Sequence, residues 1–504
     1  MSTDSLTAAD RMRLLDELIM VFDTWGRIRH LREYTAAETL GLHDRRETVE
    51  ELWRSVAHHC DVAAASRGYR ELLALALEVH PHNRVFNEIA RMLTPGADHP
   101  AAPVVAPRSR PPLRILVVAT EWSSHAGGLS TYNRRLCVAL AQAGAEVTCL
   151  AASATSVEVD AAAAERVRLV QAIASPGSSP QEALYRPPTL IGGPPDVVIG
   201  HGRITGPAAQ AHCRDHYPAA LGVHLVHMAP DEIEWHKPHG GIDRSLSAEE
   251  RTNIEVDLAE SAGLVAAVGP GVFGLFQLEL WGFPNPSDII RLDPGFMPPP
   301  IVRPVPPSSP VRVLLFGRLE DAELKGVDIA ARAVAYAAQH LRHGPELQLL
   351  VRGVPPGEGD RLREQMISWA GPSSLEVLPR VYTVDKRRVE ANLRSSSLVL
   401  MPSRADGFGL AGVEAIEQGT PLLASAKSGL GRYLREFLPP EQSRRMIVDD
   451  HPDPEVAWGQ EILGVVKRRE AAFADAAAVA AFLGELRPWS TVAADLLSAV
   501  RARL

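Results

Sequence analysis

Two proline-rich segments divide this chain into three parts, and the residue patterns around them restrict the possible folds. The first segment covers residues 98–112 and the second covers residues 299–310. Before the first segment, apolar residues recur at helical spacing and no convincing strand is present. After each segment, short apolar runs alternate with helical stretches, which is the pattern of parallel βαβ units. The pattern predicts an all-helical domain followed by two doubly wound α/β domains.

The domain boundaries follow from these breaks. We predict a helical domain at 1–97, a linker at 98–112, a first α/β domain at 113–298, a hinge at 299–310, a second α/β domain at 311–486 and a last helix at 487–504. The predicted strands are 114–119, 146–150, 196–199, 222–227, 264–268, 311–316, 347–351, 375–378 and 398–401, with another beginning at Pro421. Ligands bind at the carboxyl ends of parallel strands, so the two α/β domains should face a common cleft.

Composition excludes several classes of protein. The chain has 504 residues, 46% of them hydrophobic, and a formal net charge of −9, which argues against a general nucleic-acid binder. Its N-terminus lacks a signal-peptide pattern, and no apolar run reaches membrane-spanning length. The four cysteines, Cys60, Cys137, Cys149 and Cys213, show no CxxC pairing and are typical of reduced residues. A cytoplasmic protein is the simplest interpretation.

The segment from Pro402 to Pro421 is the most informative motif. An apolar strand precedes it, and a glycine-rich turn leads into a helix between Asp406 and Glu414. The N–H groups and dipole of such a helix N-terminus favour a bound anion. The two carboxylates can accept hydrogen bonds from sugar hydroxyls. The segment therefore predicts a phosphate and polyol site, although an ordinary strand-to-helix turn would share its pattern.

Three further features should converge on the same cleft. Arg318 and Lys325 lie on one loop after the first strand of the second α/β domain, where they could neutralise a diphosphate. Gly127 and Gly128 follow the first strand of the first domain and would allow close approach of a ligand. His201 follows another strand and could bind a sugar hydroxyl or move a proton. Each feature alone has a structural explanation, namely surface charge, a tight turn or a core histidine.

Several motifs are absent from the sequence. It contains no GxxxxGK[ST] loop, no GxSxG elbow and no Asp-x-Asp pair that would hold a metal on a diphosphate. The spacing of His224, His227, His236 and His239 fits no zinc signature, so we interpret them as acceptor-cleft or structural residues. We therefore expect no metal and no cofactor, with protein cations offsetting the charge of a leaving diphosphate.

At this point the residues resemble a known family. Residues 113–298 and 311 to the C-terminus are similar to the GT-B glycosyltransferases of family four, which are retaining enzymes acting on nucleotide-sugars. The similarity rests on the Gly127-Gly128 turn, the Arg318–Lys325 loop and the segment from Asp406 to Glu414. Residues 488–497 also resemble the family's last helix, which crosses back to the first α/β domain.

The resemblance implies roles for individual residues. Arg318 and Lys325 would bind the donor diphosphate, Asp406 would face the donor sugar, and Glu414 would hold the ribose hydroxyls. The backbone of Phe408, Gly409 and Leu410 would meet the sugar and phosphate, and His201 would lie in the cleft of the first α/β domain. The first acidic position is usually Glu in this family, whereas here it is Asp406, whose side chain is shorter by one methylene.

The helical region resembles the effector-associated domains of bacterial conflict systems, on the residues from Leu14 to Leu42 and from Gly68 to Asn83. Those domains are adaptors that pair with a similar domain on another protein. A family-specific helical extension is the alternative. The resemblance implies that residues 1–97 connect the enzyme to a protein partner in a defence or signalling system.

The sequence thus predicts a cytoplasmic glycosyltransferase that moves a sugar from a nucleotide-sugar to an unknown acceptor. Two alternatives remain. One is a nucleotide-sugar sensor without turnover, favoured by the shortened acid at Asp406. The other is a cell-envelope enzyme with peripheral membrane contact, for which Arg134 and Arg135 are the only candidate lipid contacts.

Overall fold

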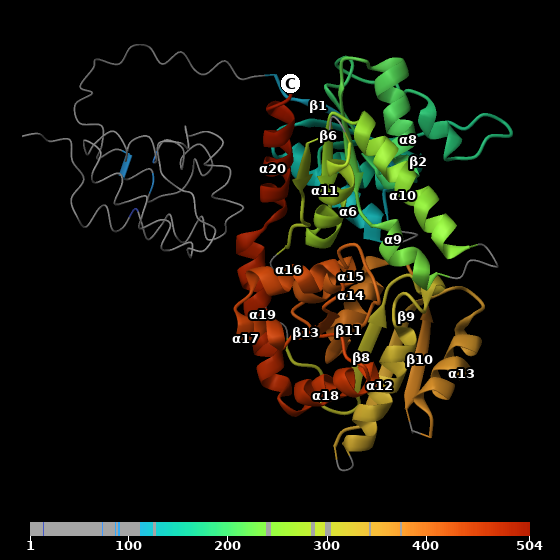
Figure 1. Cartoon of the computed structure of the whole chain (residues 1–504), viewed down its shortest axis with the longest axis vertical. Helices are drawn as coiled ribbons and strands as arrows, with labels where there is room; N and C mark the ends of the chain where they lie inside the picture. Colours follow the sequence, from blue (N-terminus) through green and yellow to red (C-terminus); the bar gives the residue numbers. More distant parts are fainter. Residues whose placement is uncertain are drawn as a thin grey trace, which may run out of the picture. The chain divides into compact units, whose positions relative to one another are not determined.

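The structure of the chain is a computed structural model (Figure 1). It describes residues 111–123, 128–237, 243–283, 288–297, 304–341, 344–372 and 375–504, together with Leu14, Leu73, Phe86, Ile89 and Ala90. The chain divides into two compact units, Met1–Arg110 and Pro111–Leu504. Almost all of the predicted helical domain, the linker up to residue 110 and residues 298–303 of the hinge region lie outside the described residues, so the domain boundaries stay predictions.

The first sheet has seven parallel strands in the order β3-β2-β1-β4-β5-β6-β7. Its strands are β1 (Arg114–Glu121), β2 (Glu146–Ser153), β3 (Val167–Gln171), β4 (Val197–His201), β5 (Leu221–Val226), β6 (Leu264–Ala267) and β7 (Ile289–Arg291). Its helices are α6 (Gly128–Gln142), α7 (Ser156–Ala164), α8 (Gly202–Ala211), α9 (Pro230–Ile233), α10 (Arg244–Ser261) and α11 (Pro270–Trp281). The strand order reverses between β1 and β4, which opens a crevice at their carboxyl ends.

The second sheet has six parallel strands in the order β10-β9-β8-β11-β12-β13. Its strands are β8 (Val311–Phe316), β9 (Leu347–Val354), β10 (Glu376–Val381), β11 (Leu398–Met401), β12 (Leu422–Ser425) and β13 (Ile447–Val448). Its helices are α12 (Val327–His340), α13 (Gly359–Ala370), α14 (Lys386–Ser395), α15 (Leu410–Glu417), α16 (Gly429–Phe437), α17 (Pro440–Arg444), α18 (Pro454–Lys467) and α19 (Arg469–Leu486). Here the order reverses between β8 and β11.

The central strands are apolar on both faces because helices cover both sides of a parallel sheet. In β1, Leu116, Val117 and Val118 are fully buried, and in β11 Leu398 is fully buried. This burial explains why these strands appear in the sequence as continuous apolar runs. The predicted pair of doubly wound α/β sheets is confirmed.

The sequence pattern missed the short or peripheral strands. β7 has three residues and β13 has two, so neither forms an apolar run long enough to recognise. β3 is the edge strand of the first sheet, and its sequence Val-Arg-Leu-Val-Gln is interrupted by polar residues. Edge positions tolerate such residues because one side of the strand has no neighbour.

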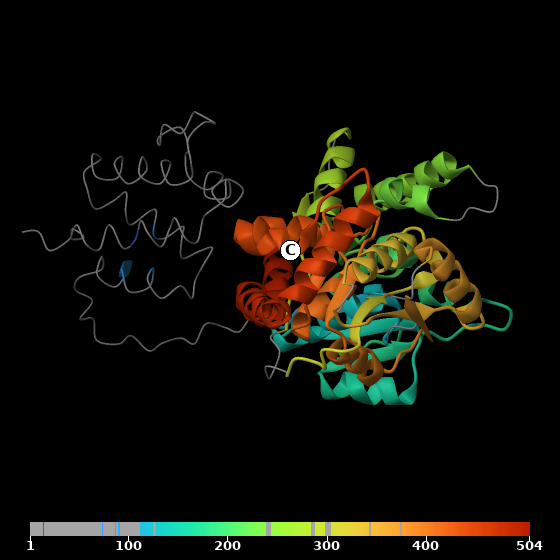
Figure 2. The same cartoon turned by 90° about the horizontal axis from the view of Figure 1, so that it is seen from below.

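The chain passes between the two sheets twice. It leaves the first sheet after β7, and it returns through α20 (Trp489–Arg501), which packs on α6. The ring of Trp489 lies 5.3 Å from that of Tyr132, and Phe296 N–H donates to the carbonyl of Arg487 at 2.8 Å. A Cβ on Gly295 would lie 2.7 Å from the Trp489 backbone, so the two crossings touch. The red C-terminal helix lies beside the first sheet in both views (Figures 1 and 2).

Cys137 and Cys149 are buried free thiols, and Cys213 is a partly buried free thiol, whereas Cys60 lies outside the described residues. Their environments agree with the predicted reduced state. Among the residues that the structure describes, no helix is both long and apolar enough to span a bilayer.

Candidate active site between the two sheets

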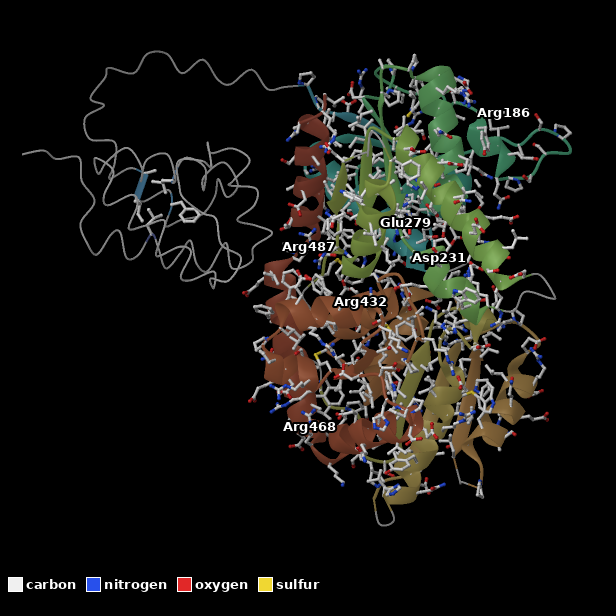
Figure 3. The ribbon with its side chains drawn as sticks, viewed as in Figure 1. Arg186, Asp231, Glu279, Arg432, Arg468 and Arg487 are labelled. Atoms are coloured by element: carbon white, nitrogen blue, oxygen red, sulfur yellow. The ribbon has the colours of Figure 1, made fainter. Side chains whose placement is uncertain are left out.

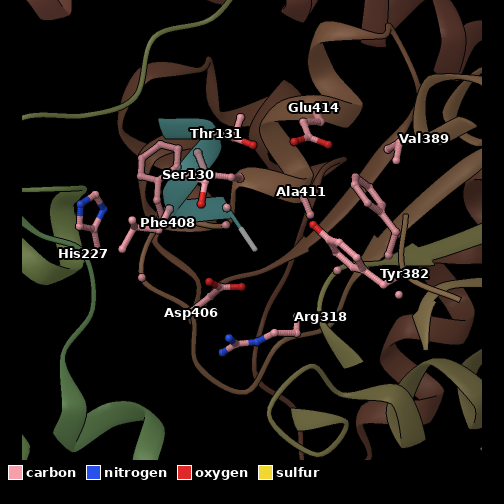
Figure 4. A pocket seen from close by; sticks show the side chains of 18 of the residues that line it. Ser130, Thr131, His227, Arg318, Tyr382, Val389, Asp406, Phe408, Ala411 and Glu414 are labelled. Carbon is pink, nitrogen blue, oxygen red and sulfur yellow. The ribbon is translucent and has the colours of Figure 1, made fainter. Parts of the chain in front are cut away.

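A cavity of about 1260 Å³ lies between the carboxyl ends of the two sheets. Its walls include Gly128, Arg134, His227, Arg318, Lys325, Asp406, Phe408, Gly409, Leu410 and Glu414. Figure 4 shows His227 on one side and Tyr382 on the other, with Asp406 beside Arg318 and Glu414 across from them. The structure therefore brings together the predicted site residues that it describes.

The turn after β11 enters α15 through Gly409, whose φ of +99° is in the left-handed region. Phe408, just before it, is buried and contacts the ring of Tyr433 edge-on at 5.5 Å. A Cβ on Gly407 would lie 2.0 Å from the carbonyl oxygen of His227, so this glycine permits the two halves to touch. The N-terminus of α15 is thereby held at the cavity wall, where its free N–H groups favour an anion.

Lys325 and Asp406 form an ion pair at this wall. Lys325 Nζ donates to Asp406 Oδ2 at 2.7 Å, and Ser403 Oγ donates to the same oxygen at 3.3 Å. The side chains are 26% and 16% exposed, so both remain accessible from the cavity. Gly326 explains how the two loops approach, because a Cβ there would lie 2.1 Å from the carbonyl oxygen of Pro402. Residues 81 positions apart thus form one ion pair.

Arg318 lies on the same wall but is more exposed. Its guanidinium is 3.9 Å from Glu320 Oε2 and 3.6 Å from Asp321 Oδ2, and 43% of its side chain is accessible. Figure 4 places its guanidinium close to Asp406. The two predicted cations therefore border the same space.

Glu414 lies one turn into α15, half-buried and facing α6. Burial raises the pKa of its carboxyl to about 7, and the charge of Arg135 only partly offsets this effect. In Figure 4 it lies near Thr131 of α6, across the cavity from Asp406. A carboxyl group in this setting is well placed to exchange hydrogen bonds with hydroxyl groups.

His201 ends β4 and is fully buried, so it reaches the cavity through a second histidine. Its Nε2 lies 3.0 Å from Asn133 Oδ1, and its Nδ1 lies 2.9 Å from His227 Nε2. Because Asn133 Oδ1 can only accept, His201 Nε2 donates to it, and His201 Nδ1 accepts from His227. Burial and the charge of His224 lower the pKa of His201 to about 3.

His227 is the histidine whose side chain faces the cavity (Figure 4). Burial and the charge of His201 hold its pKa well below the ordinary value, so the ring is neutral near pH 7. Its Nδ1 then carries a lone pair. The sequence grouped His227 with other histidines because no local signal separates it from His224. Its position at the end of β5, beside β4 in the sheet, is the signal that could have found it.

Comparison with known proteins identifies the family. Residues 116–496 match the family described as "Family 4 Glycosyltransferase in conflict systems". The chain belongs to this family. In addition, residues 4–94 of this family 4 glycosyltransferase match the family "Effector-associated domain 1", which agrees with the resemblance of the helical region.

The chain is also similar to individual proteins, at about 30% identity. The glycosyltransferase is 28% identical over 360 residues to the D-inositol 3-phosphate glycosyltransferase of Nocardia farcinica, a match covering 64% of this chain and 77% of that protein. The protein of the same name from Rhodococcus jostii is 32% identical over 194 residues, covering 38% and 40% of the two chains.

Two solved structures show the same fold. Sucrose-phosphate synthase from Thermosynechococcus elongatus aligns with a TM-score of 0.56 at 18% identity, and the alignment covers 77% of this chain and 98% of that one. HepE from Anabaena, solved in complex with UDP and glucose, aligns with a TM-score of 0.54 at 14% identity, covering 77% and 100%. The predicted GT-B fold of the glycosyltransferase is confirmed.

Of the predicted pair Gly127 and Gly128, the structure describes only Gly128. Gly127 lies outside the described residues. Gly128 begins α6, and a Cβ there would lie 2.8 Å from Leu410 Cδ1 at the start of α15. Gly128 therefore makes room for the opposite half of the protein, and it also lines the cavity, so its predicted contact with a ligand stays a prediction.

Arg135, one of the two candidate lipid contacts, is engaged elsewhere. Its guanidinium donates to both carboxylate oxygens of Glu417 on α15, at 2.6 and 2.7 Å, and the side chains are 11% and 7% exposed. Glu417 also accepts from the backbone N–H of Met297 at 3.0 Å. This arrangement removes half of the sequence evidence for membrane contact and identifies a bond between the two halves.

Within the described ranges, no group of three or more His, Cys, Asp or Glu side chains is arranged to hold a metal ion.

Proposed function

We propose that this glycosyltransferase is a retaining enzyme that transfers a sugar from a nucleotide-sugar to an acceptor hydroxyl, without a metal, as the effector of a bacterial defence or signalling system. One observation carries the proposal: the Lys325–Asp406 pair lies at the N-terminus of α15, on the wall of a cavity that both sheets share. A fixed cation beside a helix N-terminus suits a diphosphate, and a carboxylate suits the hydroxyls of the attached sugar.

The donor side would use charge. Arg318, Lys325 and the N–H groups of Gly409 and Leu410 would offset the negative charge that grows on the departing diphosphate. The backbone of Phe408 would border the sugar. Glu414, whose pKa is raised to about 7, would accept hydrogen bonds from ribose hydroxyls. These protein groups supply positive charge at the position where a metal would otherwise be needed.

The transfer step exchanges one bond at the sugar's anomeric carbon for another. The bond to the diphosphate oxygen breaks, the bond to the acceptor oxygen forms on the same face, and the acceptor's proton moves to the diphosphate oxygen. His227, with His201 and Asn133 behind it, would orient the reacting hydroxyl through its neutral Nδ1. Contacts between the halves, such as Gly407 against His227, would exclude water.

Incubation of the full chain with a panel of nucleotide-sugars tests the enzyme. We expect at least one donor to be hydrolysed or transferred, with release of a nucleoside diphosphate. The absence of turnover for every donor, with and without a protein partner, would contradict the proposal.

The effector role is supported by the effector-associated match at residues 4–94 and by the description of the matching family. We propose that residues 1–97 bind a protein that carries a similar helical domain, and that the enzyme acts in the cytoplasm. Affinity capture with the full chain and with residues 111–504 as bait should recover such a partner only with the full chain. Equal recovery by both would contradict it.

A sensor is the second candidate, favoured by the geometry of Asp406. Its short carboxylate is bound to Lys325, so its reach toward a sugar is limited. Asp406→Glu separates the two functions. If the chain is a sensor, a nucleotide-sugar binds without turnover and the longer acid increases hydrolysis; if it is an enzyme, wild type already turns over.

A further inference from the structure

The acceptor side of the cavity contains an arginine whose charge is not neutralised by a bonded carboxylate. Arg203 lies in the first turn of α8, two residues after His201, at the same edge of the first sheet as His227. It lines the cavity and is partly buried. Among the described residues, no side chain or carbonyl accepts a hydrogen bond from its guanidinium.

The two neighbouring carboxylates accept hydrogen bonds from other groups. Glu255 accepts from the backbone N–H of Arg203 at 2.8 Å and is 2.9 Å from His224 Nε2, so each of its oxygens has a partner other than the Arg203 side chain. Glu234, which is fully buried, pairs with Lys237 at 2.9 Å and with Arg251. Glu234 thus pairs with two cations, and Glu255, which also lines the cavity, accepts no hydrogen bond from the guanidinium of Arg203.

Burial makes this excess charge costly. Burial lowers the pKa of Arg203, the nearby charge of Arg251 adds to this effect, and the charges of Glu255 and Glu234 offset it only in part. A guanidinium that is partly desolvated and repelled by a second cation gains more from a bound anion than a solvated surface arginine does. Its planar fork matches the paired oxygens of a phosphate or carboxylate.

We propose that Arg203 forms an anion subsite in the acceptor half of the cavity, and that the acceptor of this glycosyltransferase carries a phosphate or carboxylate group near the hydroxyl that is glycosylated. The inference rests on the proposed function, because an acceptor exists only if the protein transfers a sugar. Anion binding at Arg203 can nevertheless be measured without turnover. Arg203 belongs to the half that contains the first sheet, whereas Arg318 and Lys325, proposed for the diphosphate, belong to the loop after β8 in the other half.

Inorganic phosphate is the probe, measured by equilibrium dialysis of the full chain at constant ionic strength. The wild type should bind phosphate both at the donor side and at Arg203. Because the donor-side cations also attract phosphate, the informative background is the Arg318→Ala/Lys325→Ala variant, which should retain one site. Adding Arg203→Ala should weaken that site at least about tenfold, the effect of losing a charge-assisted hydrogen bond.

Two matched variants sharpen the result in the same background. Arg203→Lys should retain most of the affinity, because it retains the charge. Arg214→Ala removes an arginine of the same half that is 71% exposed and paired with Asp215, and it should leave phosphate binding unchanged. Equal phosphate affinity with and without Arg203 would overturn the proposal. Thermal unfolding of each variant establishes that loss of binding is not loss of fold.

Acetate competition then distinguishes the two anions. Displacement of phosphate by equimolar acetate indicates a carboxylate-bearing acceptor, and its failure indicates a phosphate-bearing one; both require the Arg203 subsite. The outcome is independent of the donor panel. An Arg203-dependent phosphate site without any donor turnover would reject the proposed function and keep the subsite, whereas turnover without such a site would do the opposite.

Discussion

The carboxyl ends of the two sheets line one cavity, but they contribute different kinds of groups. The second sheet contributes fixed charges that are accessible to a ligand, above all the Lys325–Asp406 pair. The first sheet contributes neutral rings, with His201 buried behind His227, and the guanidinium of Arg203. One edge is suited to stabilising a charged leaving group, and the other is suited to positioning a neutral hydroxyl. Because the two edges contribute different groups, we predict that comparable substitutions at them will have unequal effects on turnover and stability.

Loss of charge at the second sheet should have the largest effect. Lys325→Ala should lower the turnover number for a nucleotide-sugar by about 10² to 10³, because one fixed group that stabilises developing charge is removed. Lys467→Ala, which removes an exposed lysine of α18, is the control and should change little. If steady-state kinetics showed an equal loss for both variants, the proposed role of the second sheet's charges in stabilising the leaving group would be wrong.

The second prediction concerns the bond between the two halves. Glu417→Ala leaves the buried guanidinium of Arg135 without its partner and should cost about 3 kcal/mol of unfolding free energy. Arg135→Ala/Glu417→Ala should cost less than the two single changes added together, because the two side chains are coupled. Arg361→Ala, which breaks an exposed pair, should cost less than about 1 kcal/mol. Urea denaturation measures all four, and additive effects would show that the pair contributes nothing as a pair.

The third prediction tests the neutrality of the first sheet's edge. The folded pKa of His201 is about 3, against 6.5 for the free side chain. Between these values the unfolded chain binds a proton that the folded chain does not. The contribution of His201 to the free energy of unfolding is therefore fully present above about pH 6.5 and falls as the pH falls below it. From pH 8 to pH 5 this group should remove about 2 kcal/mol of stability. His201→Gln should reduce that slope and the exposed His451→Gln should not; identical slopes in denaturation would argue that His201 is charged in the fold.

The smallest effect is expected where the sequence suggested a ligand contact. The added methyl of Gly128→Ala meets Leu410, whose Cδ1 at 2.8 Å can rotate away and whose Cβ at 3.2 Å must move only slightly. The change should therefore alter stability by about 1 kcal/mol and turnover only slightly. A loss of turnover comparable to that of Lys325→Ala would place the ligand against Gly128, as the sequence predicts. Kinetics and denaturation of the one variant decide between them.

The two edges also differ in how far the sequence predicted them. Arg318, Lys325, Asp406 and Glu414 could be predicted because each lies on a loop or helix start that follows a recognisable apolar strand. The pairing of Lys325 with Asp406 could not, because it depends on the approach of two loops separated by 81 residues.

The first sheet's edge was predicted less well because its roles depend on burial. The sequence selected His201 for its position after a strand, but only the packing of β4 beside β5 shows that His227 faces the cavity. The partner of Arg135 and the unbonded state of Arg203 arise from contacts between distant helices. A helical residue's local pattern does not reveal which carboxylate will face it.

Contacts between the halves are not confined to the cavity. Arg432 and Arg487, labelled in Figure 3, belong to the second part of the chain and reach the first. Arg432 pairs with Glu232 at 3.2 Å, and Arg487 donates to the carbonyl of Asp293 at 3.4 Å.

The double crossing at Gly295 and Trp489 has a mechanical consequence. Both crossings lie at the same place, so a rotation of one half against the other would displace this place least. In such a rotation Tyr132, which packs on Trp489, would keep its neighbours, while Lys325 and His227 would approach or separate. A single proteolytic cut between residues 297 and 304 would leave one crossing intact, and the two halves would remain joined.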